Sequence, residues 1–321
     1  MTDNNQCNSR IAFVFPGQGS QNPGMGKDLA ENSVAARRVF EEADEALGFA
    51  ISRLCFEGPA EDLQLTENTQ PAILTCSVAA YRAMEEAGTG VSAFVAGHSL
   101  GEYSALVASG ALNLADAVRT VRARGRYMQE AVPVGTGAMA AVIGGDLKEI
   151  QRVCEAARDS QICSVANFNS PSQAVIAGNA EAVDRAIEGL QGVAKRVIKL
   201  KVSAPFHCAL MKPAQERLAL DLAQLSFREP AMPVVTNVDA QATTIPEELR
   251  DALVRQVSAP VRWVDSMQWL IEQRVTTFVE VGPGKVLSGL MRQISRDVKT
   301  LNVEDAAGLA ATKAALAAEI I

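Results

Sequence analysis

Short apolar runs followed by glycine or proline recur along the chain and indicate buried strands. Ile11 to Phe15 ends at Pro16-Gly17, Val91 to Ala96 precedes Gly97, and Val275 to Val281 precedes another glycine. Stretches with helical spacing separate these runs and predict helices over residues 27–49, 72–87, 100–111, 114–130, 210–225 and 306–321. Because strands and helices alternate, the pattern predicts an α/β fold built on a parallel sheet.

Residues 133–202 have a different pattern, with four short strand-like runs around two charged helical segments. The predicted strands are Ala138–Ile143, Ser164–Asn167, Ala174–Ala177 and Arg196–Val202. The order β-α-β-β-α-β is typical of a ferredoxin-like unit. We therefore predict a small subdomain at 133–202, inserted into a large subdomain that consists of residues 1–132 and 203–321.

Composition and charge indicate a soluble globular chain. The 321 residues are 48% hydrophobic and 21% charged, and no stretch approaches the roughly 18 consecutive apolar residues of a membrane span. The N-terminus has no basic segment followed by an apolar one, so the predicted location is the cytoplasm. A net charge of −7 without a basic run argues against nucleic-acid binding.

Patterns for metal and nucleotide binding are absent from the sequence. The six cysteines are scattered, and no group of histidine, cysteine and carboxylate residues has the spacing of metal ligands. Gly17-x-Gly19 lacks the third glycine of a dinucleotide fingerprint, and Gly282-Pro283-Gly284-Lys285 lacks the spacing of a phosphate-binding loop. We therefore predict neither a metal nor a cofactor.

A G-x-S-x-G pentapeptide, Gly97-His98-Ser99-Leu100-Gly101, lies between a predicted strand and a predicted helix. A strand-to-helix turn of this type holds its serine in a strained conformation and exposes the hydroxyl at the edge of the sheet. The same pattern also arises by chance, because glycine and serine are common residues. The flanking strand and helix favour Ser99 as a nucleophile.

Only two histidines are available as a base for this serine. His98 is adjacent to Ser99 and is poorly placed to bend back onto its hydroxyl, so elimination leaves His207. The segment from Ala204 to Cys208 is a predicted loop that leaves the small subdomain, where a side chain can reach a cleft. A hydrogen-bonded structural histidine is the alternative interpretation. Cys208 is rejected as a nucleophile because no sharp turn presents its thiol.

Acyl transfer also requires hydrogen-bond donors for the oxyanion of the tetrahedral intermediate. The backbone N–H of Leu100, directly after the predicted nucleophile, is one donor that such a turn supplies. The second donor is expected from another loop at the same edge of the sheet. Gln18 is the candidate, because Gly17 and Gly19 beside it permit a close approach of the backbone.

Arg124 lies on the apolar face of the predicted helix 114–130, together with Ala117, Val121 and Met128. An arginine directed inward costs several kcal/mol unless an anion or a hydrogen-bond network compensates its charge. One interpretation is an internal salt bridge. The other is a bidentate clamp on a substrate carboxylate, which suits the geometry of the guanidinium group.

Six segments together resemble the malonyl-CoA:acyl carrier protein transacylases, in family order and over nearly the whole chain. The segments are Phe15–Gln21, Gly97–Tyr103, Arg124–Met128, Asn167–Ser170, Phe206–Cys208 and Glu280–Gly284. The resemblance implies an α/β-hydrolase-like core, a ferredoxin-like small subdomain and an active site in the groove between them. It further implies that the catalytic serine and histidine lie in this groove.

The resemblance also assigns roles to individual residues. Ser99 is expected to hold the malonyl group, His207 to act as general base and acid, and Arg124 to pair with the malonyl carboxylate. The N–H groups of Gln18 and Leu100 are expected to form the oxyanion hole.

Further roles follow from the same resemblance. In this family a backbone carbonyl orients the histidine, which by position points to Gln256. His98 is expected to shape the pocket, and Asn167 to support the site. Phe206 occupies a place where some members have serine, so the polarity beside His207 differs from theirs.

The implied activity is a ping-pong transfer of malonyl from malonyl-CoA to an acyl carrier protein, in support of fatty acid biosynthesis. We separately expect the protein to be a monomer. A serine thioesterase or hydrolase, a malonyltransferase of polyketide or malonate metabolism, and a non-catalytic carrier-binding protein are the alternatives. Because carrier proteins of this class are acidic, basic residues are candidate docking positions. They are Lys195, Arg196, Lys199, Lys201, Lys285 and Arg292.

Overall fold

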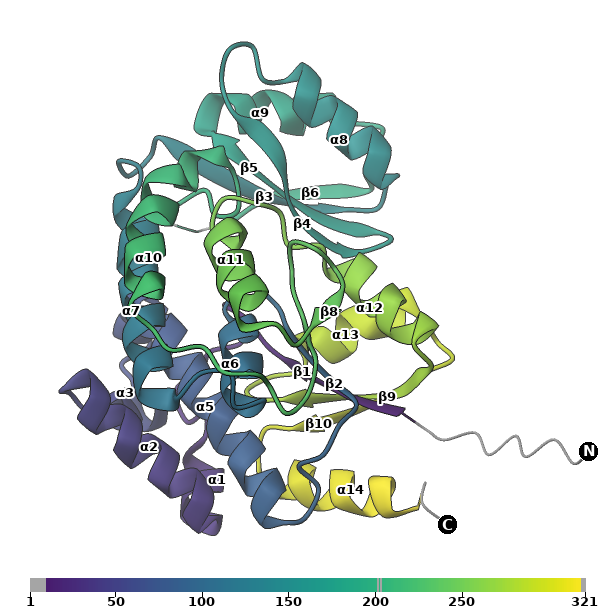
Figure 1. The fold of residues 1–321 in the computed structure, drawn as a ribbon. Helices are drawn as coiled ribbons and strands as arrows, with labels where there is room; N and C mark the ends of the chain where they lie inside the picture. The colour runs from purple at the N-terminus through teal and green to yellow at the C-terminus, as the bar shows by residue number, and fades with distance from the viewer. Residues whose placement is uncertain (1–9, 201, 203, 319–321) are drawn as a thin grey trace, which may run out of the picture.

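Two separate β-sheets organise the chain in the computed structural model, which describes residues 10–200, 202 and 204–318 (Figure 1). The larger sheet has the order β10-β9-β1-β2-β7-β8. Its strands are β1 (Arg10–Phe15), β2 (Phe94–Gly97), β7 (Val234–Val235), β8 (Ala242–Thr243), β9 (Val275–Val281) and β10 (Lys299–Val303). All neighbours in it pair in parallel except β7 and β8, which are antiparallel. The predicted parallel sheet is confirmed.

Helices cover both faces of this sheet because its central strands are apolar on both sides. Phe13 and Phe15 of β1 pack in one core cluster, whereas Ala12 and Val14 pack in a second cluster on the opposite face. The helices on the first side are α1 (Lys27–Asn32), α2 (Val34–Leu47), α3 (Ile51–Glu57), α4 (Ala60–Gln64), α5 (Thr66–Glu86), α6 (Gly101–Ala108), α7 (Leu114–Glu130), α10 (Lys212–Ala223) and α11 (Pro246–Gln256). On the second side are α12 (Trp263–Glu272) and α13 (Val286–Ile294). A 3-10 turn, Ala209–Met211, precedes α10, and α14 (Ala306–Ala317) packs beside β10.

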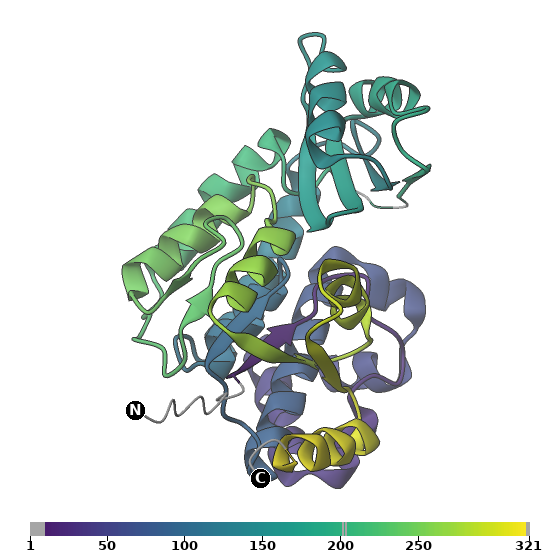
Figure 2. The same ribbon diagram turned by 90° about the vertical axis from the view of Figure 1, so that its right-hand side faces the viewer.

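The smaller sheet is antiparallel, with the order β4-β5-β3-β6. Its elements are β3 (Gly137–Ile143), α8 (Leu147–Ala156), β4 (Cys163–Ser170), β5 (Gln173–Asn179), α9 (Ala180–Gly189) and β6 (Arg196–Lys199). This is the β-α-β-β-α-β order expected of a ferredoxin-like unit. Figures 1 and 2 show these elements as a separate teal lobe at the top of the molecule. The fold class is therefore as predicted, while the subdomain limits of 1–132 with 203–321 and 133–202 stay predictions.

Backbone hydrogen bonds join the small lobe to the rest of the chain. Val261, just before α12, forms a parallel bridge with Asn167 of β4. Its N–H donates to Ala166 O at 2.9 Å, and its carbonyl accepts from Phe168 N at 2.9 Å. The end of β4 is therefore paired on one side with its own sheet and on the other with the segment that enters α12.

Two predicted helices have different limits in the structure. The helix expected over 27–49 is divided at Ser33, which has an extended backbone and accepts a hydrogen bond from Ala36 N as the cap of α2. The helix expected over 72–87 begins at Thr66, so Pro71 lies inside it rather than before its start. An interior proline costs about 3 kcal/mol, but most of α5 is buried, and packing outweighs the local preference.

The structure also contains helices and strands that the sequence pattern did not predict, and one predicted helix is shorter than expected. The sequence pattern missed β10, α11, α12 and α13, and the predicted helix 100–111 ends at Ala108. The predicted helices 114–130 and 306–321 correspond to α7 and α14, although residues 319–321 lie outside the described part of the chain. No helix in the described ranges is long and apolar enough to cross a membrane.

Candidate active site

Ser99 lies on the sharp turn between β2 and α6, with a φ of +51°. The neighbouring glycines are sterically required. A Cβ on Gly97 would lie 1.9 Å from the carbonyl of Gly101, and a Cβ on Gly101 would lie 2.1 Å from the carbonyl oxygen of Phe15. Because no larger residue fits at either position, the turn stays tight and places the serine at the carboxyl end of the parallel sheet.

His207 is within hydrogen-bond distance of the serine, although 108 residues separate them in the chain. Ser99 Oγ and His207 Nε2 are 2.7 Å apart, and His207 Nδ1 is 2.9 Å from the backbone carbonyl oxygen of Gln256. A carbonyl oxygen only accepts, so Nδ1 holds the ring proton and donates it. The lone pair of Nε2 therefore faces the serine hydroxyl.

The imidazole is neutral at neutral pH. Burial and, to a lesser extent, the nearby positive charge of Arg124 lower the pKa of His207 to about 3. The side chain is 5% exposed, and its residue has a φ of +57°. A neutral imidazole with a free Nε2 lone pair is suited to accept the proton of Ser99. The structure thus brings together the two residues that the sequence nominated.

Arg124 reaches the same hydroxyl from α7. Its Nη2 donates to Ser99 Oγ at 3.1 Å and to Gln256 Oε1 at 3.0 Å, and its Nη1 donates to Gln70 Oε1 at 2.8 Å. The side chain is only 1% exposed, as expected from its place on the apolar face of the helix. Burial lowers the pKa of Arg124, yet a guanidinium remains protonated in proteins.

A direct salt bridge to Arg124 is absent within the described ranges, since its terminal nitrogens contact amide and hydroxyl oxygens instead. Its Nε is buried without a hydrogen-bond partner there. The ring of Tyr103 lies 5.8 Å from the guanidinium carbon. The internal salt bridge considered from sequence is therefore not what the structure contains. The guanidinium instead lies beside the nucleophile.

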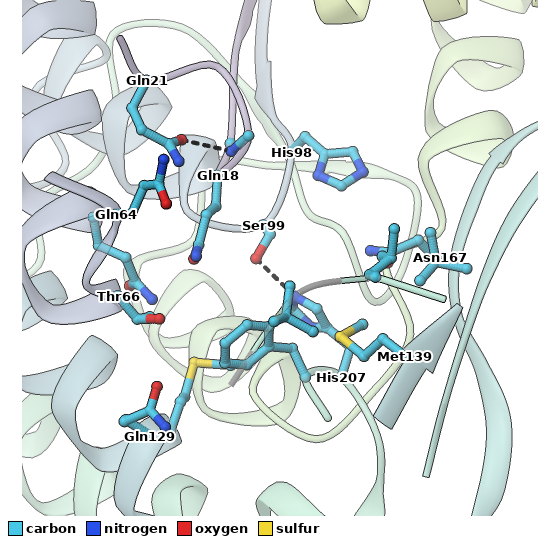
Figure 3. A pocket seen from close by; sticks show the side chains of 18 of the residues that line it. Gln18, Gln21, Gln64, Thr66, His98, Ser99, Gln129, Met139, Asn167 and His207 are labelled. Atoms are coloured by element: carbon cyan, nitrogen blue, oxygen red, sulfur yellow. Dashed lines mark hydrogen bonds between the residues drawn. The ribbon is translucent and has the colours of Figure 1, made fainter. Parts of the chain in front are cut away.

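A pocket of about 1130 Å³ surrounds this group, and both sheets contribute to it (Figure 3). Figure 3 shows Ser99 and His207 joined across it, with Met139 and Asn167 of the small lobe along one wall. The predicted site residues that line it are Gln18, His98, Ser99, Arg124, Asn167 and His207. The site is thus a concave pocket with a small number of convergent polar groups, as is usual for small-molecule sites.

The two predicted oxyanion donors follow neighbouring parallel strands, β1 and β2. Gln18 follows β1 and lines the pocket, and Leu100 directly follows Ser99. Neither N–H donates a hydrogen bond to any other described residue. Both groups are consistent with the predicted role, which stays a prediction.

His98 and Asn167 line the same pocket away from the serine hydroxyl. His98 Nε2 is 2.8 Å from Asn169 Oδ1, and its ring packs against Trp263 with centroids 5.4 Å apart. Burial lowers the pKa of His98. Asn167 is buried in β4 at the bridge to Val261. The pocket-shaping role of His98 and the supporting role of Asn167 stay predictions.

Sequence reasoning missed several polar residues around the serine, chiefly Glu102, Asn237 and the side chain of Gln256. Ser99 N donates to Asn237 Oδ1 at 2.6 Å, and Gln256 Nε2 donates to Ser99 O at 3.0 Å. One signal was available, since Asn237 ends the strand-like run 233–237 and carboxyl ends of parallel strands meet at one edge. The partners of Glu102 lie 135 and 154 residues away, and no local pattern indicates them.

Comparison with known proteins is consistent with this geometry. Residues 12–316 match the family model of the acyl transferase domain. The malonyl CoA-acyl carrier protein transacylase of Escherichia coli (strain K12) is 52% identical over 287 residues, which cover 89% of this chain and 93% of that protein. The enzyme of the same name from Bacillus subtilis (strain 168) is 50% identical over 299 residues, covering 92% and 94%.

Solved structures give the same result. An acyl carrier protein S-malonyltransferase from Vibrio cholerae matches with a TM-score of 0.93 at 47% identity, covering 95% of this chain and 100% of that chain. A malonyl-transacylase in complex with a type II PKS acyl-carrier protein matches with a TM-score of 0.93 at 46% identity, covering 96% and 100%. The chain therefore belongs to the acyl transferase family, among the malonyl-CoA:acyl carrier protein transacylases.

Proposed function

We propose that this chain transfers a malonyl group from malonyl-CoA to the phosphopantetheine thiol of an acyl carrier protein, by a ping-pong mechanism through a malonyl-serine ester. One observation supports this most directly. The same hydroxyl, Ser99 Oγ, contacts a neutral histidine and a buried arginine that has no acidic partner within 4 Å among the described residues. A base activates the serine, and a guanidinium without an acidic partner favours an acyl group with a carboxylate.

The first half-reaction forms the ester. As Ser99 Oγ attacks the thioester carbonyl carbon, its proton moves to His207 Nε2, and the N–H groups of Gln18 and Leu100 stabilise the oxyanion. Collapse of the tetrahedral intermediate breaks the C–S bond, and the imidazolium returns the proton to the coenzyme A sulfur. The carbonyl of Gln256 keeps the ring oriented throughout, in the place that an aspartate occupies in serine protease triads.

The second half-reaction reverses the first with another thiol. His207 accepts the proton of the carrier protein's phosphopantetheine thiol, and the thiolate attacks the ester carbonyl. The C–O bond to Ser99 breaks, and the protonated imidazole returns the hydrogen to the serine oxygen. No step uses a metal or a cofactor.

The position of Arg124 supports malonyl as the acyl group. Its guanidinium lies 3.1 Å from the serine oxygen, so an acyl group on that oxygen is within its reach. Malonyl provides a carboxylate for it and acetyl does not. The names of the relatives support malonyl as the acyl group and an acyl carrier protein as the acceptor. Supply of fatty acid biosynthesis, a monomeric state and a cytoplasmic location are part of the proposal.

Carrier-protein docking is proposed for the surface of α13. This helix contributes Val286, Leu287 and Leu290 to the pocket lining and has exposed Arg292 in its last turn. Of the other candidates, Lys285 and Lys199 form exposed ion pairs with acidic neighbours, which contribute little stability. Lys195 and Arg196 are exposed on the small lobe. Lys201 lies outside the described residues.

Mass spectrometry of the intact protein tests the proposal. Incubation with malonyl-CoA should add one malonyl group, which disappears on addition of a holo carrier protein and is absent from Ser99→Ala. Steady release of free malonate with or without the carrier protein would instead identify a hydrolase. No adduct at all would identify a non-catalytic binding protein. Charge reversal of Arg292 should raise KM for the carrier protein and leave KM for malonyl-CoA unchanged.

A further inference from the structure

A buried polar cluster of Glu102, Asn237 and Gln256 lies beside the serine and the arginine. The three residues are 1%, 1% and 0% exposed, and they come from α6, the segment after β7 and the end of α11. Unpaired polar groups at such depth are costly. Most of the hydrogen-bonding groups in this cluster have partners, which are other members of the cluster or the neighbouring residues Gly97, Ser99 and Arg124.

Glu102 contacts the backbone of Asn237 and the side chain of Gln256. Its Oε2 accepts from Asn237 N at 2.8 Å and from Gln256 Nε2 at 3.0 Å. A carboxylate only accepts and a guanidinium only donates. The amide of Gln256 lies between Glu102 and Arg124, so its NH₂ group must face Glu102 and its oxygen must face Arg124, as observed.

The cluster holds Ser99 on both sides of its strained backbone. Asn237 Oδ1 accepts from Ser99 N at 2.6 Å, and Asn237 Nδ2 donates to Gly97 O at 2.6 Å. Gln256 Nε2 donates to the carbonyl of Ser99 at 3.0 Å. These contacts oppose relaxation of the positive φ at Ser99, which is unfavourable for a residue with a side chain.

When ionised, Glu102 is also a negative charge close to Arg124, separated from it by the side-chain amide of Gln256. Arg124 contacts amide oxygens on both terminal nitrogens, those of Gln70 and Gln256. Burial raises the pKa of Glu102 to about 7, whereas hydrogen bonds from Asn237 and Gln256 and the charge of Arg124 act in the opposite direction. The neutral amide of Gln256 thus lies between Glu102 and Arg124 and takes the place of a direct ion pair between them.

We propose that Glu102 is a positioning residue that provides a counter-charge to Arg124 through the amide of Gln256, and so leaves the guanidinium available for the substrate carboxylate. A carboxylate in direct contact would occupy the donors that an anionic acyl group needs. If no anion lay nearby, the buried charge of Arg124 would be uncompensated, at a high cost in stability. One intervening amide avoids both outcomes. The inference rests on the proposed function, because it assumes an acyl group with a carboxylate.

Gln256→Glu tests the role of the neutral spacer. The substitution keeps the backbone carbonyl that orients His207 and places a carboxylate directly on Arg124. We expect kcat/KM for malonyl-CoA to fall at least about tenfold more than kcat/KM for acetyl-CoA. The reason is that the introduced carboxylate at position 256 competes with the malonyl carboxylate for Arg124. Gln293→Glu is the matched control. It makes the same change on α13, where Gln293 Oε1 accepts from Ser170 Oγ, and should alter neither value.

Glu102→Gln tests the counter-charge by a measurement that does not depend on turnover. The variant keeps a hydrogen-bond acceptor and removes the charge. Malonylation of Ser99 should then raise its Tm by about 2 °C or more beyond the rise in the unaltered chain, since the malonyl carboxylate replaces the missing anion. Acetylation should give no such difference.

The outcomes separate the inference from the proposed function. If the unaltered chain forms no malonyl adduct, the proposed function is wrong and the inference fails with it. If the adduct forms but Gln256→Glu reduces malonyl and acetyl transfer equally, the inference alone is wrong. Equal Tm gains on malonylation of Glu102→Gln and of the unaltered chain would also refute it.

Discussion

The two sheets contribute different things to one pocket. The parallel sheet is buried on both faces, and the segments after β1, β2 and β7 provide Gln18, Ser99 and Asn237 at one edge. The antiparallel sheet packs α8 and α9 on one face and turns the other toward the pocket, where Met139 and Val175 form part of the wall. The nucleophile and the loops around it therefore come from strand ends of the parallel sheet, whereas His207 and Arg124 come from a loop and from α7, and the small lobe provides shape.

The difference follows from geometry. Carboxyl ends of parallel strands converge, and the turns that follow them can bring residues far apart in sequence within hydrogen-bond distance. A strand in an antiparallel sheet instead presents alternate side chains along a face. Loss of a group at a parallel strand end should therefore affect the chemistry, and loss of a side chain on the small sheet should affect fit.

The largest effect is expected from Ser99→Ala. Removal of the nucleophile should lower kcat by at least about 10⁴-fold, with no malonyl adduct by mass spectrometry and little change in Tm. Retention of more than a hundredth of the activity would show that the strand end does not provide the nucleophile.

Arg124→Ala should have the next largest effect, and it should depend on the acyl group. Breaking a buried charge interaction reduces malonyl transfer by about 10²- to 10³-fold, while acetyl transfer changes by less than about tenfold. Steady-state kinetics with malonyl-CoA and acetyl-CoA measure the difference. Arg119→Ala, on the exposed side of the same helix, serves as the control. Equal losses on both substrates would assign Arg124 a structural role only.

Met139→Ala tests the small lobe. This side chain is 4% exposed and faces the pocket from β3, so its truncation enlarges the pocket. We expect KM for malonyl-CoA to rise a few-fold with kcat nearly unchanged, and a stability loss of about 2 kcal/mol. A large fall in kcat with an unchanged KM would contradict the division of labour between the two sheets.

The smallest expected effects concern pH and stability. The pKa of His207 is lowered to about 3 by burial and by the charges of Arg124 and His98. The unfolded chain therefore binds this proton at a higher pH than the folded chain, and stability falls as the pH decreases from the ordinary value of 6.5 toward 3. Thermal unfolding between pH 7 and 4 should show a shallower decline for His207→Gln.

Glu102 should have the opposite effect in an overlapping pH range. Burial raises its pKa to about 7, with Asp239 acting in the same direction and Arg124 against it. The folded chain then binds this proton first, so its contribution to stability decreases as the pH rises from 4.5 through 7. Glu102→Gln should therefore steepen the loss of stability on acidification. A parallel shift of the whole curve, with no change in slope, would contradict the pKa assigned to Glu102.

Some of the site was predictable from sequence because local rules determine it. The strand-to-helix turn at Ser99 requires glycines at two fixed positions, and the inward direction of Arg124 follows from helical spacing alone. His207 was found only because histidine is rare in this chain. Its contact with the carbonyl of Gln256 followed from the family resemblance and has no local signal.

The rest depends on tertiary contacts that no short pattern encodes. Glu102 lies on a helix whose residues are all buried, so hydrophobic periodicity gives it no distinct position. The start of α5 at Thr66 has a similar cause, because burial of the helix outweighs the local preference of Pro71. Long-range packing therefore determines both the supporting residues and several element limits.

The backbone bridge between Val261 and β4 sets the spacing between the two lobes without using any side chain that takes part in the reaction. Main-chain hydrogen bonds form whatever the side chain, so the spacing between the two lobes at this point is insensitive to most substitutions. Lining residues on the small sheet can therefore be exchanged one at a time, with the opposite wall held at a constant distance. Attempts to make this scaffold accept bulkier acyl groups should begin at those lining positions and leave the 166–168 and 260–262 segments intact.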